Sequence, residues 1–452
     1  MNARLFTRGL GLLIFLSVSD VVHSAPDTPI ATPAPTATPA QPLSPESDWQ
    51  TLKLKILNDF GDRIAREFKV PKGLAERTSF WFDVYGRYGE AHHIIHHVRY
   101  PWVVFKVVDT TQMLEHGKGP LWLRRERAQK LARLETAAVR KALARLSRRS
   151  SFKNLPPLEK RLFEVLARLP GSRRAVFRFA AQNVRSQLGQ KTFFERGLVS
   201  SSKYLPYMED EFRQAGLPVE LTRMPFVESS FNVEARSKVG ASGIWQIMPR
   251  TGKSYMIVND NIDERNSPLK ATRAAARLLR GYYRSLDSWP LTITSYNHGI
   301  GNIQKAIKAA RSRDLATIIS RYHRGDFKFA SSNFFTCFLA ALHAEKYHEL
   351  VFKDLPREPL QEYEIYRLAG RTRASYLAKL TGLPKDELLD YNLDLRNALR
   401  RNSLVPKGYN LHLPPAAKDR LMRRIGTQEK PGRPSTQGLR ERFKKRPRGR
   451  SV

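Results

Sequence analysis

A single acidic residue, Glu228, lies beside an apolar helical pattern and is the first candidate for chemistry. Leu221, Met224 and Val227 recur at helical spacing and predict an apolar face. Glu228 comes next, where this pattern ends, and Phe231 follows it. Apolar neighbours and the negative end of a helix both raise the pKa of a carboxyl group. Glu228 is therefore a candidate general acid near neutral pH, although a solvated acid just past a core helix is the alternative.

Two later segments carry polar and aromatic side chains. In residues 237–251 the glycines allow a tight turn or a close backbone approach. We expect Trp245, Gln246 and Met248 to project from a short helix there, ended by Pro249. We expect Trp245 to pack in the core, with stacking on a ligand as the alternative.

A second helix is predicted at residues 289–299, ended by Gly299, and it carries Tyr296 and Asn297.

These segments, in this order, resemble the catalytic domain of soluble-lytic-type murein transglycosylases, closest to the membrane-bound lytic murein transglycosylase D subfamily. The family pattern is Glu-Ser-x-Phe, then Gly-x-x-Gly-x-x-Gln-x-Met-Pro-x-Thr, then Ala-Tyr-Asn-x-Gly. The chain reads Glu228-Ser-Ser-Phe, Gly240-Ala-Ser-Gly-Ile-Trp-Gln-Ile-Met-Pro-Arg-Thr and Ser295-Tyr-Asn-His-Gly, with Ser295 in place of the family alanine. The resemblance covers roughly residues 190–350 and implies a goose-lysozyme-like α fold.

The resemblance also implies roles for individual residues. Glu228 would be the sole general acid and base. Ser237 would hydrogen-bond the N-acetyl group of the substrate or the intermediate, and Tyr296 would position Glu228 or stabilise the transition state. The remaining implied contacts with substrate, or with its surroundings, are Gln246, Met248 and Asn297.

The count of carboxylates bears on the reaction type. A glycosidase that uses water normally needs two carboxylates beside the scissile bond. The matched segments supply one, and neither Glu234 nor Asp263 occupies a matched position. One acid suffices if the substrate's own C6 hydroxyl attacks C1, which leaves a 1,6-anhydro-muramyl end. The alternatives are a goose-lysozyme-like hydrolase and a catalytically inactive wall-binding scaffold.

We expect no metal and no cofactor. The sequence has no zinc-type spacing, phosphate loop or nucleotide fingerprint. Histidines 92, 93, 96 and 97 could bind metal on a helix, but no carboxylate or Cys completes a ligand set nearby, so a structural role is favoured. Cys337, the single cysteine, is expected to be a buried thiol in a helix.

Charge and the N-terminus bear on partners and location. The 452 residues include 78 Lys and Arg against 42 Asp and Glu, a net charge of +36, which favours a polyanionic partner. Arg4 and Arg8 precede a short apolar run, and a secretory signal peptide is predicted over residues 1–24, without a lipid-attachment Cys. Export to the periplasm, outer membrane or cell wall makes nucleic acid an improbable partner. No later stretch is apolar enough to span a membrane.

The expected fold is predominantly α. An amphipathic basic helix at residues 121–149 is either a solvated face or a dock for an anionic wall or membrane surface. Short apolar runs at residues 80–85 and 100–108 are compatible with strands or buried helices. Ser267 and Pro268 predict a helix start, and Ser331 or Ser332 is expected to cap a last helix over residues 333–350.

A change of pattern follows residue 362. Two alternating segments near residues 363–368 and 409–414 enclose two short helical pieces, near 373–381 and 384–391. This β-α-α-β unit resembles a LysM peptidoglycan-binding module, although Gly370-Arg-Thr-Arg replaces the usual Gly-Asp-Thr-Leu. Six parts are therefore predicted: a signal peptide (1–24), a Pro/Thr/Ala-rich disordered linker (25–47), a mostly helical region (48–190), the catalytic domain (191–355), a LysM-like module (360–415) and a basic disordered tail (416–452).

Overall fold

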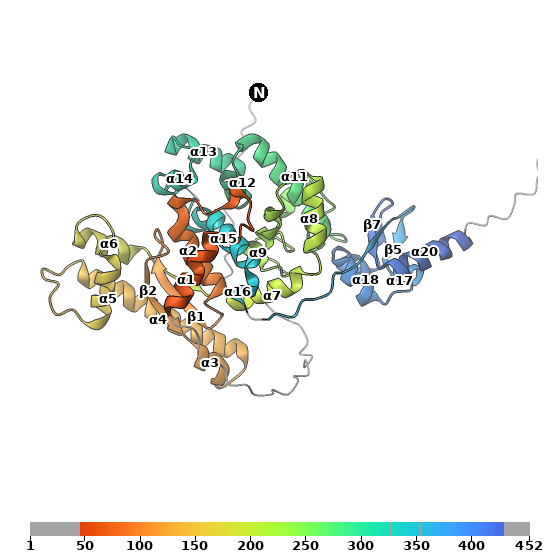
Figure 1. Cartoon of the computed structure of the whole chain (residues 1–452). Coiled ribbons are helices and arrows are strands. Elements are labelled where there is room, and N and C mark those ends of the chain that lie inside the picture. Colours follow the sequence, from red (N-terminus) through yellow and green to blue (C-terminus); the bar gives the residue numbers. More distant parts are fainter. Residues whose placement is uncertain (1–45, 326, 353, 429–452) are drawn as a thin grey trace, which may run out of the picture. The chain divides into compact units, whose positions relative to one another are not determined.

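The computed structural model describes residues 46–325, 327–352 and 354–428, and these form two compact units (Figure 1). The first unit holds the described residues up to Met256 together with 265–360, and the second holds 257–264 together with the described residues after 360. The predicted signal peptide, most of the linker and the end of the tail lie outside the described residues. The prediction of a predominantly α fold is confirmed.

The N-terminal part of the first unit combines helices with a small sheet. Its helices are α1 (Glu46–Leu57), α2 (Ala75–Gly86), α3 (Thr111–His116), α4 (Leu121–Leu146), α5 (Pro157–Leu166) and α6 (Arg173–Gln182). Its strands are β1 (His92–His97), β2 (Val104–Asp109) and β3 (Val184–Leu188), in the antiparallel order β2-β1-β3. The ambiguous run at residues 80–85 thus belongs to a helix, and much of 100–108 belongs to a strand.

The four histidines of the predicted cluster lie on strand β1 rather than on a helix. Side chains alternate between the two faces of a strand, so His92 and His96 share one face, and His93 and His97 share the other. Burial lowers the pKa of His93 to about 4, of His96 to about 3 and of His97 to about 4. Neutral imidazoles packed in the sheet are therefore expected at physiological pH.

The rest of the first unit is helical. It contains α7 (Lys191–Ser201), α8 (Leu205–Gln214), α9 (Met224–Ser229), α10 (Pro249–Lys253), α11 (Pro268–Leu286), α12 (Trp289–His298), α13 (Ile300–Ala310), α14 (Leu315–Arg321), α15 (Phe329–Lys346) and α16 (His348–Val351). The predicted cap at Ser267 is confirmed, since its side chain accepts a hydrogen bond from the Lys270 N–H.

Helix α15 lies at the centre of this unit, packed against α2, α9 and α12 (Figure 1). Its residues from Phe329 to Ala344 are almost all buried, which explains why its sequence is apolar on every side. Cys337 is fully buried in this helix, as predicted. The predicted cap was wrong, because α15 begins four residues earlier than expected and Ser331 lies inside its first turn.

The second unit contains the predicted strand–helix–helix–strand order. Strands β4 (Glu364–Arg367) and β7 (Asn410–Leu413) pair antiparallel and enclose α17 (Ala374–Thr381) and α18 (Lys385–Tyr391). The unit also has α19 (Arg396–Arg401), the short pair β5 (Thr372–Arg373) and β6 (Leu404–Val405), and α20 (Pro415–Gln428). The first part of the predicted disordered tail is therefore helical, because Ala417 and Leu421 are buried in the core of this unit.

A segment distant in sequence completes the second unit. Residues 257–264 belong to it, although their neighbours on both sides in the chain belong to the first unit. Ile262 is 2% exposed within its apolar core, and the Asp263 N–H donates to the Asp394 carbonyl at 3.1 Å. The predicted catalytic domain, residues 191–355, is thus interrupted by a piece of the second unit.

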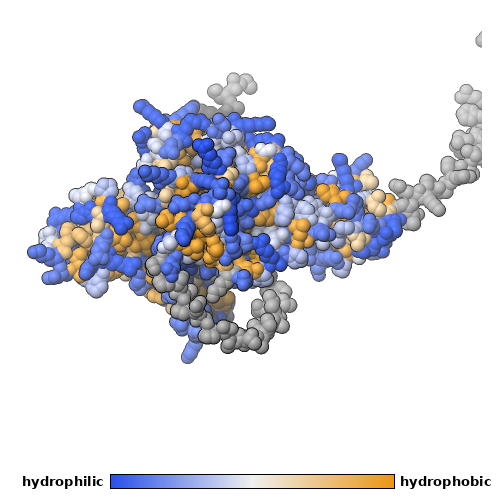
Figure 2. All heavy atoms as spheres, viewed as in Figure 1, coloured by the Kyte–Doolittle hydropathy of each residue, from blue (hydrophilic) through white to orange (hydrophobic). Residues whose placement is uncertain are grey.

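Hydrophilic side chains cover most of the face shown in Figure 2, with separate hydrophobic patches between them. Among the described residues, no helix combines the length and the apolar character that crossing a lipid bilayer requires.

Candidate active site

Glu228 lies near the end of the short helix α9, as the sequence predicted. A 3-10 turn over Val219–Arg223 leads into α9, and Pro225 stands in the first turn, where a missing N–H costs no hydrogen bond. The helix ends because Ser230 and Phe231 adopt left-handed backbone, with φ of 50° and 55°. The apolar helical pattern predicted from Leu221 to Val227 is thus divided between a 3-10 turn and a short α-helix.

The Glu228 carboxyl is desolvated. The residue is 7% exposed, and burial raises its pKa from 4.5 to about 8. No hydrogen bond or ion pair reaches this side chain from any residue that the structure describes. Burial alone explains the shift, and no second carboxylate among the described residues contributes to it. Such a group keeps its proton at neutral pH and can donate it.

Aromatic rings pack on one another around helix α9. The Phe226 ring stacks on Phe194 at a centroid distance of 4.7 Å and packs on Phe231 at 4.6 Å. The Tyr85 ring also packs on Phe194, with a centroid distance of 5.4 Å. Burial raises the pKa of the Tyr85 phenol well above its usual value, with contributions from Cys337 and from the charge of Glu228.

Tyr85 is a site neighbour that the sequence reasoning missed. It comes from helix α2, more than a hundred residues before the matched segments, and the packing of α2 on α15 and α7 brings it there. The aromatic run at residues 80–85 was visible in the sequence, but nothing in it pointed toward Glu228.

The loop after α9 is held by its own backbone. Ser237 N–H donates to the Ala241 carbonyl at 2.9 Å, and Ala241 N–H donates to the Ser237 hydroxyl at 2.8 Å. Gly243 has φ of +73°, and a Cβ there would lie 1.8 Å from the Arg265 carbonyl oxygen. Only glycine fits, because both the conformation and the space exclude a side chain.

Gln246 is buried inside this loop. Its Nε2 donates to the carbonyls of Gly243, at 2.8 Å, and Ala235, at 3.1 Å. These two hydrogen bonds join separate parts of the loop. Gln246 therefore stabilises the conformation of the loop, independently of any contact with a ligand. Met248 is half-buried and immediately precedes α10. The expected helix before Pro249 is absent, because Pro249 starts a short helix instead of ending one.

Trp245 belongs to the core. It is fully buried, its indole N–H donates to the Thr272 hydroxyl at 2.8 Å, and its ring stacks on Phe212. This favours the packing interpretation over sugar stacking. The Trp245 carbonyl accepts a 2.7 Å hydrogen bond from the Tyr296 hydroxyl.

Tyr296 and Asn297 lie together near the end of α12, and both are half-buried. Burial raises the pKa of the Tyr296 phenol well above its usual value, and the Glu228 charge adds to this rise, so the two side chains are near each other. Asn297 Oδ1 accepts a hydrogen bond from the Ser331 hydroxyl at 3.2 Å. Ser331, predicted as a helix cap, instead ties α12 to α15.

Ser229 joins the acid-bearing helix to the loop. Its hydroxyl donates to the Ile244 carbonyl at 2.9 Å, one residue before Trp245. Through Ser229 and Tyr296, the helices α9 and α12 are both fixed to the backbone of the same loop. The structure thus brings Glu228, Gln246 and Tyr296 into one region, with Ser237, Met248 and Asn297 on the same elements.

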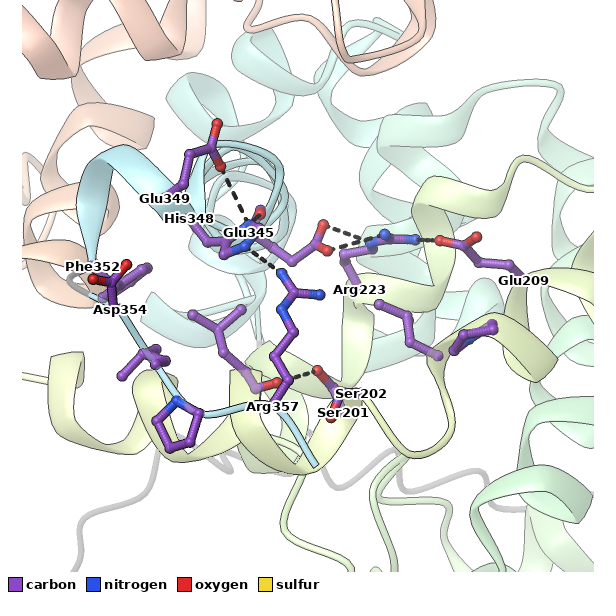
Figure 3. A pocket seen from close by; sticks show the side chains of 15 residues that line it. Ser201, Ser202, Glu209, Arg223, Glu345, His348, Glu349, Phe352, Asp354 and Arg357 are labelled. Atoms are coloured by element: carbon purple, nitrogen blue, oxygen red, sulfur yellow. Dashed lines mark hydrogen bonds and ion pairs between the residues drawn. The ribbon is translucent and has the colours of Figure 1, made fainter. Parts of the chain in front are cut away.

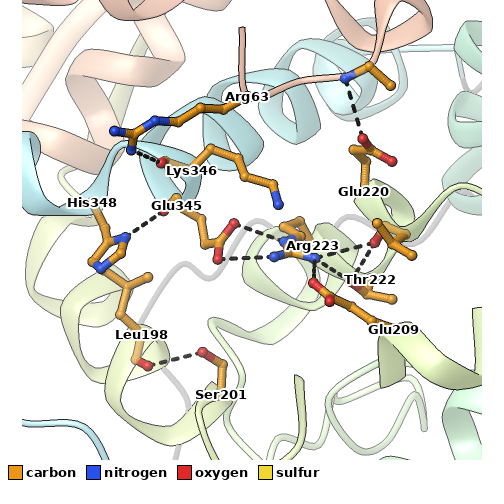
Figure 4. Close-up of polar contacts among 12 residues, drawn as sticks. Arg63, Leu198, Ser201, Glu209, Glu220, Thr222, Arg223, Glu345, Lys346 and His348 are labelled. Carbon is orange, nitrogen blue, oxygen red and sulfur yellow. Dashed lines mark hydrogen bonds and ion pairs between the residues drawn. The ribbon is translucent and has the colours of Figure 1, made fainter. Parts of the chain in front are cut away.

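Arg223 anchors the start of α9 (Figures 3 and 4). Its guanidinium is buried and makes a bidentate pair with Glu345 of α15, at 2.9 and 3.1 Å. A third contact joins it to Glu209 of α8. Burial alone would raise the pKa of the Glu345 carboxyl, but the Arg223 charge outweighs burial and lowers it. The Glu345 carboxylate therefore stays ionised, and the contacts of Arg223 with Glu345 and Glu209 fix the helix that carries Glu228.

A cavity of about 420 Å³ opens beside this anchor (Figure 3). It is lined by residues of α7, α8, α15 and α16 and by the segment 354–357, including Arg223, Glu345 and Arg357. None of the six predicted site residues lines it. Its charged groups are mostly paired with one another, as in the Arg357–His348 contact.

Comparison with known protein families gives a match to the part of the chain that contains Glu228. Residues 208–319 match the protein family described as "Transglycosylase SLT domain". This stretch is an SLT domain. Glu228, Ser237, Gln246, Met248, Tyr296 and Asn297 all lie within it, whereas Tyr85, Ser331 and Glu345 lie outside.

Three curated proteins are similar to part of this chain. The chain is 33% identical over 132 residues to "Membrane-bound lytic murein transglycosylase D" of Escherichia coli (strain K12), covering 29% of each chain. The protein of the same name from Escherichia coli O6:H1 gives the same values. A "Putative tributyltin chloride resistance protein" of Alteromonas sp. (strain M-1) is 33% identical over 112 residues, which cover 24% of this chain and 54% of that protein. The similarity thus spans less than a third of the two transglycosylases.

No group of three or more metal-ligating side chains occurs within the described ranges. The SLT domain brings one buried acid, a closed polar loop and a phenol together, an arrangement suited to proton transfer.

Proposed function

We propose that this protein is a peptidoglycan lytic transglycosylase that cleaves the β-1,4 bond between MurNAc and GlcNAc without water. The observation that carries the proposal is Glu228, a buried carboxyl with a pKa of about 8 inside an SLT domain. The similarity to proteins named lytic murein transglycosylase D supports the same substrate. The products would be strands with 1,6-anhydro-MurNAc ends, formed during cell-wall remodelling or turnover.

In the proposed mechanism, Glu228 acts twice. As an acid it protonates the glycosidic oxygen, and the C1–O bond breaks while the N-acetyl oxygen of the substrate stabilises the positive C1 centre. The Glu228 carboxylate then takes the proton from the C6 hydroxyl as that oxygen attacks C1. Glu228 loses one proton in the first step and regains one in the second. Neither a second carboxylate nor a cofactor is therefore required.

Roles for the other residues follow the same proposal. Ser237 contacts the N-acetyl group, and Gln246 and Met248 line the sugar subsites. Tyr296, fixed by its bond to the Trp245 carbonyl, positions Glu228 or stabilises the developing charge, and Asn297 supports this wall.

The remaining parts of the proposal concern location. We propose that the chain is exported through its N-terminal signal peptide to the periplasm, outer membrane or cell wall. We also propose that the second unit is a LysM-like module that lies near glycan strands. Basic segments of the chain would contact anionic wall or membrane surfaces.

Product analysis tests the function. Purified sacculi would be digested with the wild-type chain and with Glu228→Gln, which keeps the volume of the side chain but removes its acidic proton. We expect anhydro-muropeptides from the wild type and a loss of activity of about a hundredfold or more in the variant. Reducing MurNAc ends without anhydro forms would instead identify a goose-lysozyme-like hydrolase.

A catalytically inactive wall-binding scaffold is the remaining alternative. If the wild type binds sacculi but releases no muropeptide, that alternative is correct. Equal digestion by wild type and Glu228→Gln would remove Glu228 from the mechanism.

A further inference from the structure

The outer face of helix α4 carries a cluster of cations and large apolar side chains, outside the SLT match at residues 208–319. Residues 121–182 contain 17 Lys and Arg against 4 Asp and Glu, a net charge of +13. One side of α4 packs into a hydrophobic cluster with α5, α6 and β2 through small and apolar residues. These buried residues are Ala128, Ala132, Val139, Ala142, Leu143 and Leu146.

The opposite side of α4 carries cations that lack carboxylate partners. Lys130, Arg133 and Lys141 are exposed, and helical spacing places all three on the side away from the buried residues. Among the described residues, no ion pair joins any of these three to an acid. By contrast, Arg125 pairs with Glu90 and Arg145 pairs with Glu159. Some cations of the helix are therefore held by acids of the same unit, whereas these three are not.

Two large apolar side chains share this outer side. Trp122 is 67% exposed and Leu134 is 61% exposed, whereas Trp81, Trp245 and Trp289 are at most 8% exposed. Helical spacing puts Trp122 and Leu134 within the same outward arc as the three cations. Exposed indole and leucine side chains set among unpaired cations are typical of helices that lie in a membrane interface.

We propose that the outer face of α4 docks on an anionic lipid surface. Lys130, Arg133 and Lys141 contact phosphate groups of the lipids, while Trp122 and Leu134 enter the region between headgroups and acyl chains. An anionic wall polymer would satisfy the cations equally well. It offers no apolar environment for Leu134, and this favours lipid as the occupant.

Vesicle sedimentation with the full chain tests this proposal. The vesicles are phosphatidylcholine alone or phosphatidylcholine mixed with phosphatidylglycerol, and purified sacculi are assayed in parallel. The test variant carries Lys130→Gln, Arg133→Gln and Lys141→Gln together, and a second variant is Trp122→Ala. The matched control carries Arg277→Gln, Lys305→Gln and Lys308→Gln, which removes the same charge from exposed positions on α11 and α13.

The wild type and the control should bind the anionic vesicles equally and the neutral vesicles hardly at all. Each interfacial cation contributes about fivefold to such binding, so the test variant should bind at least about tenfold more weakly. Trp122→Ala should also bind more weakly. All changes lie on exposed side chains, so thermal unfolding should be unchanged, and digestion of sacculi should continue at the wild-type rate.

Three results would overturn the proposal. Equal loss in the test variant and the control would show that overall charge, rather than this face, binds lipid. Weaker binding to sacculi with unchanged binding to vesicles would identify wall polymer as the occupant. Wild-type vesicle binding by both the test variant and Trp122→Ala would exclude α4 altogether.

Discussion

The protonation state of Glu228 determines the pH range in which the proposed reaction can run. Burial raises its pKa to about 8, so the carboxyl is mostly protonated at neutral pH and loses its proton as the pH rises through that value. The first step needs the protonated form. We therefore expect muropeptide release to fall on the alkaline side with an apparent pKa of about 8, measured as initial rates on sacculi across a pH series.

An exposed glutamic acid would give a different profile. With an ordinary value of 4.5, the same reaction would already lose activity in mildly acidic solution. An alkaline limb near that value would show that Glu228 is hydrated in the working enzyme. Thermal unfolding measured at each pH separates loss of activity from loss of structure.

Individual site residues were predictable where a local pattern carried them. The position of Glu228 at the end of an apolar helical run predicted its desolvation, and the structure confirms it. Tyr85 was not predictable, because its place near Glu228 depends on the packing of two helices that are distant in sequence. The catalytic and substrate-binding roles of the six predicted residues stay predictions until activity is measured.

At the scale of single elements, Arg223 anchors the start of helix α9 through buried ion pairs. Its guanidinium is 3% exposed, and α9 has only six residues, too few to be stable alone. Arg223→Ala would leave the Glu345 carboxylate buried without its partner. We expect a loss of ~3–5 kcal/mol in the free energy of unfolding, measured by urea denaturation.

A double variant serves as the matched control for Arg223. Changing Arg223→Met together with Glu345→Met removes both charges and keeps most of the buried volume. Because apolar replacement of a buried pair is often nearly neutral, this variant should recover most of the lost stability. If the single and double variants were equally unstable, packing rather than the ion pair would hold α9.

Local sequence could not decide every helix cap, nor whether short apolar runs form helices or strands. Ser267 was predicted as a cap from the Ser-Pro pattern, and its side chain does accept a hydrogen bond from the Lys270 N–H of its own helix. Ser331 was misassigned because its hydroxyl bonds Asn297 on another helix. Periodicity could not assign the apolar runs at residues 80–85 and 100–108, and the structure shows that the first lies in a helix and the second is largely a strand.

At the scale of the whole molecule, composition and repeated patterns predicted a mainly helical chain with a change of character after residue 362. They did not predict that the second unit includes residues 257–264, because no local pattern distinguishes this short segment from an ordinary loop. Nor did the Lys/Arg-rich composition after residue 415 reveal a helix, since Ala417 and Leu421 are the few apolar positions that bury it.

The membership of Ile262 in the second unit gives a test of this division. Ile262 lies inside the SLT match in sequence but packs with Leu395 and Leu411 in the core of the second unit. Ile262→Ala should therefore destabilise the second unit by ~2–5 kcal/mol, the usual cost of emptying a buried isoleucine site. Hydrogen exchange read by mass spectrometry should become faster in peptides from residues 361–428 and stay unchanged in peptides from α12 and α15.

Ile303→Ala is the matched change in the first unit, since Ile303 is fully buried in α13. It should speed exchange in peptides from α12 and α13 and leave residues 361–428 unchanged, because each cavity opens within a different core. If Ile262→Ala left residues 361–428 fully protected, the second unit would be stable without the inserted segment. If Ile262→Ala instead speeds exchange there, residues 361–428 depend on the inserted segment for part of their core. Expressed alone, they should then fold less stably than they do in the complete chain.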